Sequence, residues 1–443
     1  MRTNSQASAS YDTEFFTEAL SPSRKLGIRL QDLHPAKVAL AGILAYLVLF
    51  MVAPVRVAVP LPWSAAGYLA ACYAAFLFGA SFLGPALSRD ITPSAVRRLI
   101  SPRLRLIVTL MGMVGIILRF VDRFFLRGAF GASDVLDRQM ALSRGGTTFT
   151  AIGAALLYPF CYLPLFFYVW DERRGGKRRP ILLLFALVMF FYPAIDGVAV
   201  GSRSLLLVNA TMFILLLIVS GKVRFTFKAI TVTVLLMVIL VSISSTVFLN
   251  RLDAMGIDPA FSVYSSAYAF TLPPTDAFGT LLTTGDSVER IIGYSFISTL
   301  QYMLHGVFEF GYLYQTFTGD HTYGGIEFDI YFKTVHMMFG QPWNLIDPRQ
   351  RTGIFSTFFG SLYVDFGLVG IPLMGLLGSL AYRIWRLVVC GAREVLPIFL
   401  YLMVTTFFFP TMNLIEGAQG LYTVSAFISF ILLVRLDSGI ASG

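Results

Sequence analysis

Charged side chains are scarce in this sequence of 443 residues, where they occupy 13% of the positions. Hydrophobic residues occupy 56%, and the mean hydropathy of +0.73 lies well outside the range of a soluble domain. This composition excludes a soluble globular protein. It predicts an all-α polytopic membrane protein that forms a single integral membrane domain over residues 1–443.

Cysteine and histidine are also rare. The three cysteines, Cys72, Cys161 and Cys390, lie in or beside apolar runs and are too scattered for a disulfide framework or a zinc site. The four histidines have no metal-ligand spacing, and Walker A, HExxH and GxSxG signatures are absent. We therefore expect no metal and no cofactor. Any catalysis must use dispersed residues that helix packing brings together.

Long apolar runs, in contrast, recur along the chain. A hydrocarbon core of about 30 Å requires roughly 20 apolar residues per helix. Ten runs meet this length approximately, near residues 38–58, 63–87, 104–121, 149–170, 181–200, 204–220, 229–249, 362–382, 394–412 and 419–435. The first run is long enough to span, so we expect it to act as the insertion signal, with no cleavable signal peptide before it.

Lys and Arg set the expected orientation, because they are retained in short cytoplasmic loops. Five arginines lie in residues 88–105, five basic residues in 171–180 and three in 221–228. With ten spans, this pattern places both termini, including residues 1–36, in the cytoplasm. The net charge of +9 is then explained mainly by the Lys and Arg residues of the cytoplasmic loops. It does not indicate nucleic-acid binding, since no basic stretch is interleaved with aromatic residues.

The same topology makes residues 250–361 a large external loop, the only extramembrane region long enough to build a site. Asp286 and Glu289 have the spacing of a capping box. The aromatic and apolar residues that follow predict an amphipathic or re-entrant helix. A further membrane span there stays open, although Arg290 and Glu309 disfavour a lipid-facing one.

Arginine, rather than lysine, carries the positive charge of the expected external surface. The arginines that we select there are Arg203, Arg251, Arg290, Arg349 and Arg351. A guanidinium binds phosphate oxygens bidentately and stays charged when partly desolvated, so this pattern indicates a bound pyrophosphate. Two structural alternatives stay open. Arg203 can anchor a tight hairpin by snorkelling, and Arg349 and Arg351 can pair with the nearby carboxylates of Asp347 or Asp365.

Residues 351–386 resemble the span-entry region of bacterial O-antigen polymerases of the Wzy type. The resemblance extends to many spans, cytoplasmic termini, a short arginine-bearing external turn and a second, large external loop. The loop motif of this family, an arginine followed after ten residues by a glycine, occurs from Arg349 to Gly360. The equivalent motif is absent at Arg203, because position 214 is Ile214.

The resemblance implies a metal-independent glycosyltransferase in the bacterial inner membrane. The growing glycan would leave its undecaprenyl pyrophosphate and join the non-reducing end of a new lipid-linked repeat unit at the periplasmic face. The implied partners are undecaprenyl-pyrophosphate-linked oligosaccharides, membrane lipids and a chain-length regulator protein. Loop 250–361 would then be periplasmic.

The resemblance also suggests roles for individual residues. Departure of the lipid pyrophosphate builds negative charge that preorganised arginines stabilise, and we expect Arg203 and Arg349 to do so, with Arg351, Arg290 and Arg251 as further candidates. A base must activate the acceptor hydroxyl. The candidates are His336, Glu309 and Asp329, which the sequence does not rank.

Two alternative functions stay open. An O-antigen ligase shares the arginine chemistry but transfers the glycan to lipid A core. A polysaccharide flippase or other secondary transporter belongs to a different class. Transporters place charged groups within spans near the bilayer midplane, often in inverted repeats. Here the charges concentrate outside the expected spans, and the two halves of the sequence show no evident repeat.

Overall fold

A computed structural model describes residues 30–91, 100–128, 148–173, 179–199, 204–221, 249, 252, 256–284, 287–340, 347–351 and 354–440. Throughout these ranges the regular structure is helical, with one isolated bridge between Val55 and Pro274. Seven helical segments there are long and apolar enough to cross a membrane. By helix length and hydropathy, the chain is therefore an all-α, multi-pass membrane protein, as predicted.

The candidate spans agree with most of the expected runs. They are Pro35–Val52, Trp63–Ala86, Pro102–Leu126, Phe149–Asp171, Pro180–Val198, Thr357–Val389 and Gly417–Ser438. The helices that form them are α2 (Pro35–Val52), α3 (Trp63–Phe78), α4 (Gly84–Ala86), α6 (Pro102–Phe120), α8 (Phe149–Leu157), α9 (Leu163–Arg173), α10 (Pro180–Ala199), α17 (Thr357–Phe366), α18 (Gly370–Val389) and α20 (Gly417–Ile440).

Three of the ten expected runs have a different outcome. Helix α11 (Ser204–Val219) has 16 residues and is apolar but short. Helix α19 (Leu396–Phe407) has only 12 residues, about 18 Å, and is almost wholly buried in the protein. The run at 229–249 lies outside the described residues except for Leu249. Hydropathy does not distinguish an apolar helix that faces lipid from one that faces protein, which explains the longer expectation for α19.

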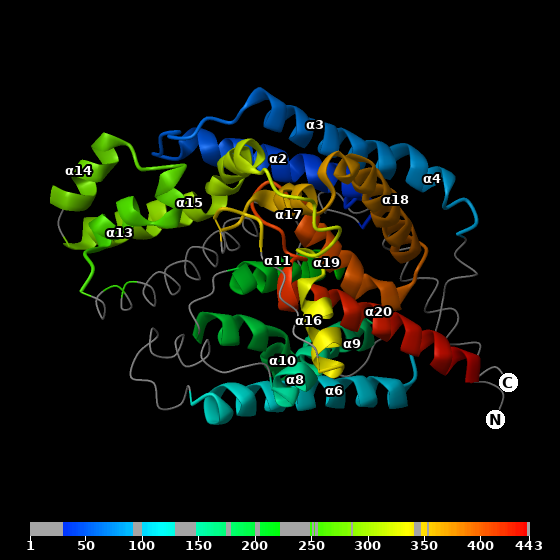
Figure 1. The fold of residues 1–443 in the computed structure, drawn as a ribbon. Helices are drawn as coiled ribbons and strands as arrows, with labels where there is room; N and C mark the ends of the chain where they lie inside the picture. Colours follow the sequence, from blue (N-terminus) through cyan, green and yellow to red (C-terminus); the bar gives the residue numbers. More distant parts are fainter. Residues whose placement is uncertain are drawn as a thin grey trace.

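Among the described residues, the two largest of four buried hydrophobic clusters form most of the core. The larger joins α6, α9, α10, α11, α19 and α20, and the smaller joins α2, α3, α17 and α18 with the end of α15 (Ser287–Thr316). Figure 1 shows α11 and α19 between a layer of α2 and α3 and a layer of α6, α8 and α10. The centre of the bundle is therefore α19, where Phe399, Leu400 and Val404 have no exposed surface.

Contacts between helix termini show which termini lie together at each end of the bundle. At one end, Ser101 before α6 donates its backbone N–H to Asp437 near the end of α20, at 3.3 Å. At the opposite end, Arg119 near the end of α6 binds Asp196 near the end of α10, at 2.6 Å. The helices between residues 259 and 284 lie at this second end, at the left of Figure 1. The direction in which each span crosses a membrane, and the side that each end faces, stay predictions.

Among the described residues of the expected external loop, four α-helices lie wholly within it: α13 (Pro259–Ser265), α14 (Asp276–Thr284), α15 and α16 (Asp329–Met338). Helix α15 is continuous over 30 residues, or about 45 Å. It extends from α13 and α14 at the left of Figure 1 toward the bundle. There Phe310 stacks on Tyr68 of α3, with ring centroids 5.7 Å apart. This path carries the second half of α15 to the centre of the site described below.

Candidate functional site

A pocket lies where α15 meets the segment of residues 347–356. Glu309 of α15 lines it together with Arg349, Arg351 and Ser356, and its cavity volume is about 10 Å³. Glu309 and Arg351 are separated by 42 positions in the sequence. The fold thus brings three of the predicted site residues into one place, which we call the arginine pocket.

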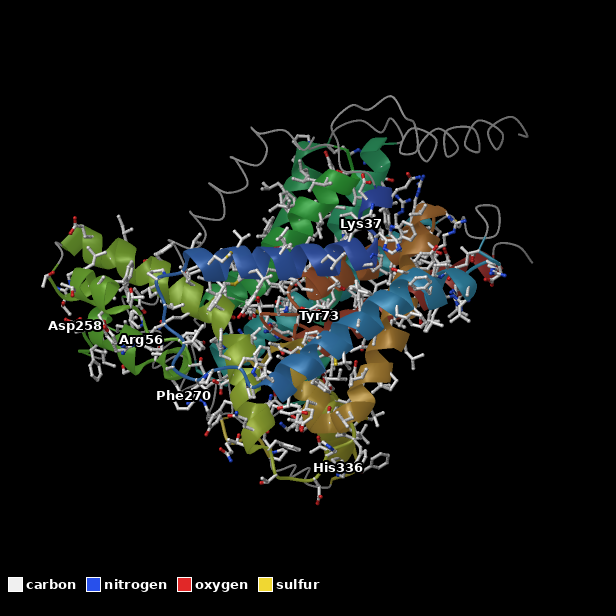
Figure 2. The ribbon with its side chains drawn as sticks, turned by 90° about the horizontal axis from the view of Figure 1, so that it is seen from above. Lys37, Arg56, Tyr73, Asp258, Phe270 and His336 are labelled. Atoms are coloured by element: carbon white, nitrogen blue, oxygen red, sulfur yellow. The ribbon has the colours of Figure 1, made fainter. Side chains whose placement is uncertain are left out.

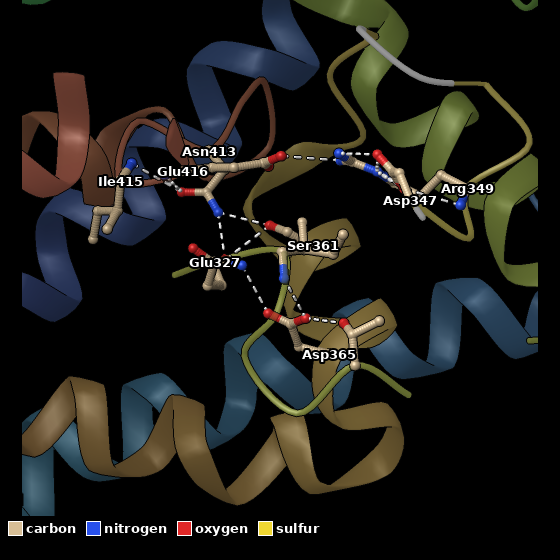
Figure 3. Close-up of polar contacts among 10 residues, drawn as sticks. Glu327, Asp347, Arg349, Ser361, Asp365, Asn413, Ile415 and Glu416 are labelled. Atoms are coloured by element: carbon tan, nitrogen blue, oxygen red, sulfur yellow. Dashed lines mark hydrogen bonds and ion pairs between the residues drawn. The ribbon is translucent and has the colours of Figure 1, made fainter. Parts of the chain in front are cut away.

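Arg349 is held by two carboxylates (Figure 3). Its Nε lies 3.0 Å from each carboxylate oxygen of Asp347, and its Nη2 lies 2.8 Å from Oδ2. Its Nη1 donates to Oε1 of Glu416 at 3.1 Å. Burial opposes the charged guanidinium, but the hydrogen bonds and charges of Asp347 and Glu416 outweigh it and raise the pKa of Arg349. The pairing with Asp347 that the sequence left open is therefore present.

Arg351 has a different environment in the same pocket. Its Nε donates to Oε1 of Glu309 at 2.7 Å, and its Nη2 donates to the carbonyl oxygen of Ala267 at 2.6 Å. Its Cζ lies 4.1 Å from the ring centroid of Phe270, a cation–π contact. A guanidinium has five N–H donors. Those that remain make no hydrogen bond within the described part of the chain, so Arg351 has donors available for an anion.

Glu309 has one engaged and one unengaged oxygen. Its Oε1 accepts from Arg351, whereas its buried Oε2 has no hydrogen-bond partner among the described residues. Burial raises the pKa of Glu309, and the neighbouring charge of Arg351 opposes that rise. The unpaired oxygen is a candidate proton acceptor that is closed to solvent in this conformation, so a bound hydroxyl reaches it only after neighbouring side chains move.

His305 lies one helical turn before Glu309 and is fully buried. Its Nδ1 lies 2.9 Å from the carbonyl oxygen of Gln301, which assigns the ring proton to Nδ1. Its Nε2 has no partner among the described residues. Burial lowers the pKa of His305 to about 4, so the ring is neutral at physiological pH.

A buried polar network fixes the position of Glu416 (Figure 3). The Oδ1 of Asn413 accepts from the backbone N–H groups of Ile415 and Glu416, at 3.0 and 3.2 Å. The Nδ2 of Asn413 donates to Oε1 of Glu327 at 2.6 Å and to Oγ of Ser361 at 2.7 Å. The network thus connects the turn before α20 to α17 and to the segment before α16.

Asp365 and Glu327 are both buried, but they differ in the hydrogen-bond donors that stabilise their negative charge. Asp365 accepts from the backbone N–H groups of Ile326 and Glu327, each at 2.9 Å, and from the hydroxyl of Thr322. Glu327 accepts from uncharged side chains. Its burial, together with the charge of Glu416, raises the pKa of Glu327 to about 8. Glu327 is therefore mostly protonated at neutral pH.

The backbone beside the arginine pocket is strained. Thr357 has a φ of +68°, a region that β-branched residues rarely adopt. Its Oγ1 accepts from the backbone N–H of Phe359 at 3.1 Å, which holds the first turn of α17. A Cβ at Gly360 would lie 2.0 Å from Oγ of Ser356. The glycine of the Arg349-to-Gly360 motif therefore makes room for a side chain that lines the pocket.

Other predicted site residues lie elsewhere. Arg290 donates through Nη2 to the carboxylate of Asp258 at 3.0 and 3.3 Å. It precedes Glu309 on α15 by 19 residues (309 − 290), or about 28 Å along the helix. Asp329 pairs with Lys333 at 2.5 Å on α16.

His336 lies further along α16, and Figure 2 places it far from Asp258. Neither Asp329 nor His336 lines the arginine pocket. Arg203 and Arg251 lie outside the described residues, as does Asp286 of the expected capping box. Among the residues that the structure describes, no group of three or more His, Cys, Asp or Glu side chains is placed to hold a metal ion.

Sequence reasoning missed Glu416, Asn413 and Glu327. One available signal for Glu416 was its position in the short loop between the last two expected spans. The orientation of the spans does not require a charged residue there, so a lone carboxylate suggests another role. Asn413 and Glu327 gave no such signal, because their role depends on contacts with residues 52 and 86 positions away.

A comparison with known proteins finds no matching protein family, no similar curated protein and no similar solved structure. The resemblance to O-antigen polymerases therefore stays a hypothesis. It depends on the motif from Arg349 to Gly360, on residues 351–386 and on the organisation of the chain.

Proposed function

We propose that this protein polymerises undecaprenyl-pyrophosphate-linked oligosaccharide repeat units at the periplasmic face of the bacterial inner membrane. The growing glycan is transferred to the non-reducing end of a new repeat unit, and undecaprenyl pyrophosphate is released. The observation that supports this proposal is the meeting of Arg349, Arg351 and Glu309 in one pocket. Two guanidinium groups and one buried carboxylate can supply the anion stabilisation and the proton removal that the transfer requires.

Each of these residues has a role in the proposed transfer. Oε2 of Glu309 takes the proton of the acceptor hydroxyl while the hydroxyl oxygen bonds to the anomeric carbon of the donor glycan. The bond from that carbon to the pyrophosphate oxygen breaks, and its electron pair leaves with the pyrophosphate. Arg349 and Arg351 stabilise the resulting charge. Arg351 also orients Glu309 through Oε1.

The pocket must change its protonation to receive an anion. Arg349 and Arg351 supply two positive charges, and Asp347, Glu309 and Glu416 supply three negative charges when ionised, so the sum is −1. Burial raises the pKa of Glu416, although Arg349 opposes it. Uptake of one proton by Glu416 brings the sum to zero and releases Nη1 of Arg349 for a phosphate oxygen. Glu309 stays available as the base.

A secondary transporter is the second candidate, and one observation favours it. Arg119 and Arg123 share the carboxylate of Asp196, at 2.6 and 2.5 Å, and all three side chains are largely buried within candidate spans. Charges inside spans are typical of transport pathways. The cluster lies at the ends of α6 and α10 rather than midway along them, which favours a structural role.

A reaction with purified components separates the candidates. The full-length protein in detergent is incubated with the lipid-linked repeat unit alone, and glycan length is measured on a gel. A polymerase lengthens the glycan, and a ligase leaves it unchanged until lipid A core is added. A transporter changes glycan length under neither condition, which would refute the proposal.

We expect polymerisation to persist in excess EDTA, and loss of activity that Mg²⁺ or Mn²⁺ restores would contradict the metal-independent mechanism.

A further inference from the structure

A second pocket lies on the other side of the ion pair between Arg349 and Glu416. Residues at the start of α11, at the start of α20 and in the middle of α19 line it, and its cavity volume is about 90 Å³. Glu416 lines this second pocket, whereas Arg349 lines the arginine pocket. We call it the α11–α20 pocket. The ion pair therefore forms part of the wall between the two pockets.

Residues 354–356 form another part of that wall. Ile354 and Ser356 line the arginine pocket, while Phe355 lines the α11–α20 pocket. One thickness of chain thus separates the two pockets, and a single elongated molecule could occupy both.

The lining of the α11–α20 pocket mixes polar, uncharged side chains with about as many apolar ones. Gln419 and Thr423 lie on successive turns of α20, and the side-chain amide of Gln419 makes no hydrogen bond to the described residues. The hydroxyl groups of Tyr162 and Tyr401 donate to protein oxygens at 2.8 and 2.7 Å. Their oxygen atoms therefore remain as acceptors. Glu416 adds a carboxylate.

This lining selects against two kinds of ligand. No Lys or Arg is among the described residues that line the pocket, so these residues offer an anion no cationic partner. A purely apolar ligand would leave the side-chain amide of Gln419 without a partner, at the cost of its desolvation. A polyhydroxylated ligand avoids both penalties, because each hydroxyl donates one hydrogen bond and accepts two. Phe355 supplies an apolar face for a sugar ring.

We propose that the α11–α20 pocket binds a neutral saccharide, the sugar portion of a substrate whose pyrophosphate lies in the arginine pocket. This assignment rests on the proposed function for the identity of the sugar, but the binding itself is testable without catalysis. It assigns the anionic and neutral parts of one substrate to opposite sides of the Arg349–Glu416 pair.

Two probes test the assignment on the purified full-length protein. One is the oligosaccharide released from the lipid-linked repeat unit by mild acid, and the other is inorganic pyrophosphate. We expect Gln419→Ala to weaken oligosaccharide binding about 3- to 10-fold, the effect of one lost neutral hydrogen bond. We expect Leu205→Trp, which fills the same pocket, to weaken it by more than about 10-fold. Pyrophosphate binding should not change in either variant.

Gln315→Ala is the matched control, because Gln315 is an exposed glutamine on α15 that lines neither pocket. Both probes should bind this variant as they bind wild type. If Leu205→Trp does not fold, Gln419→Ala decides alone.

The outcomes separate this assignment from the proposed function. Failure of the wild type to bind the oligosaccharide, or unchanged binding in the α11–α20 pocket variants, overturns the assignment. Oligosaccharide binding that the variants weaken, without any pyrophosphate binding by wild type, supports the saccharide pocket and refutes the pyrophosphate site.

Discussion

Arg349 and Arg290 belong to the same expected external loop, but their surroundings differ. The side chain of Arg290 is 35% exposed and pairs with Asp258, which is 56% exposed. The side chain of Arg349 is 13% exposed and contacts two carboxylates that are each 27% exposed. Exposed ion pairs contribute about 0–1 kcal/mol and hold their groups loosely. Arg349 is instead fixed in orientation, as a site for a planar, bidentate ligand requires.

The difference arises from where the partners come from. Arg290 meets partners on α14 and before α13, within the peripheral helices. Arg349 meets Glu416, a residue 67 positions away that a buried network positions. The presence of an arginine alone therefore does not distinguish a substrate-binding residue from a structural one. Burial of the side chain and contacts with residues that are distant in the sequence do distinguish them.

The largest effect is expected for Glu309→Gln. The amide can still accept from Arg351 through Oε1 but cannot take a proton, so the rate of polymerisation should fall about 10²- to 10⁴-fold. The measurement is the initial rate with purified protein and lipid-linked repeat unit. Glu289→Gln is the matched control, an exposed glutamate on the same helix. A rate within about 3-fold of wild type would exclude Glu309 as the base.

Arg349→Lys should have the next largest effect. Lysine keeps the charge but loses the planar fork, so at least one charged hydrogen bond to the pyrophosphate is lost. Such bonds contribute about 1.5–3 kcal/mol, so polymerisation should slow by roughly 10- to 150-fold. Arg349→Ala should be slower still. Glycan length in a polymerase-deleted strain, at matched membrane abundance, measures both, and wild-type lengths with Arg349→Lys would contradict the role.

Glu327→Gln should change the pH dependence of stability. The folded-state pKa of Glu327 is raised from 4.5 to about 8, so its contribution is fully present below about pH 4.5 and is lost as the pH rises toward 8. The Tm of wild type in detergent should fall over this interval and then level off. The glutamine side chain of the variant cannot titrate, so the variant should show a flatter profile. Parallel profiles would show that Glu327 is ionised throughout.

The smallest effect is expected for Arg290→Lys. An exposed ion pair with Asp258 tolerates the exchange of one cation for another, so polymerisation should stay within about 2-fold of wild type. If Arg290→Lys slows polymerisation as much as Arg349→Lys does, the proposed difference in role between Arg290 and Arg349 is wrong. The assay is the same initial rate that serves for Glu309→Gln.

Hydropathy was sufficient to predict the helical membrane class and most of the spans, because length and apolar content determine which segments can cross a bilayer. It overestimated α19, whose apolar residues face protein. For the site, local sequence suggested that Arg349 pairs with Asp347, two residues away. It did not suggest the pairing of Arg351 with Glu309 or of Arg349 with Glu416, because these depend on tertiary packing between separate helices.

Direct binding of undecaprenyl pyrophosphate tests the central claim, that Arg349 belongs to a pyrophosphate site and Arg290 does not. The affinity is measured for wild type, Arg349→Lys and Arg290→Lys in lipid nanodiscs, at one salt concentration. We predict that Arg349→Lys weakens binding by roughly 10- to 150-fold and that Arg290→Lys leaves it unchanged. Equal affinity of wild type and Arg349→Lys would contradict the account.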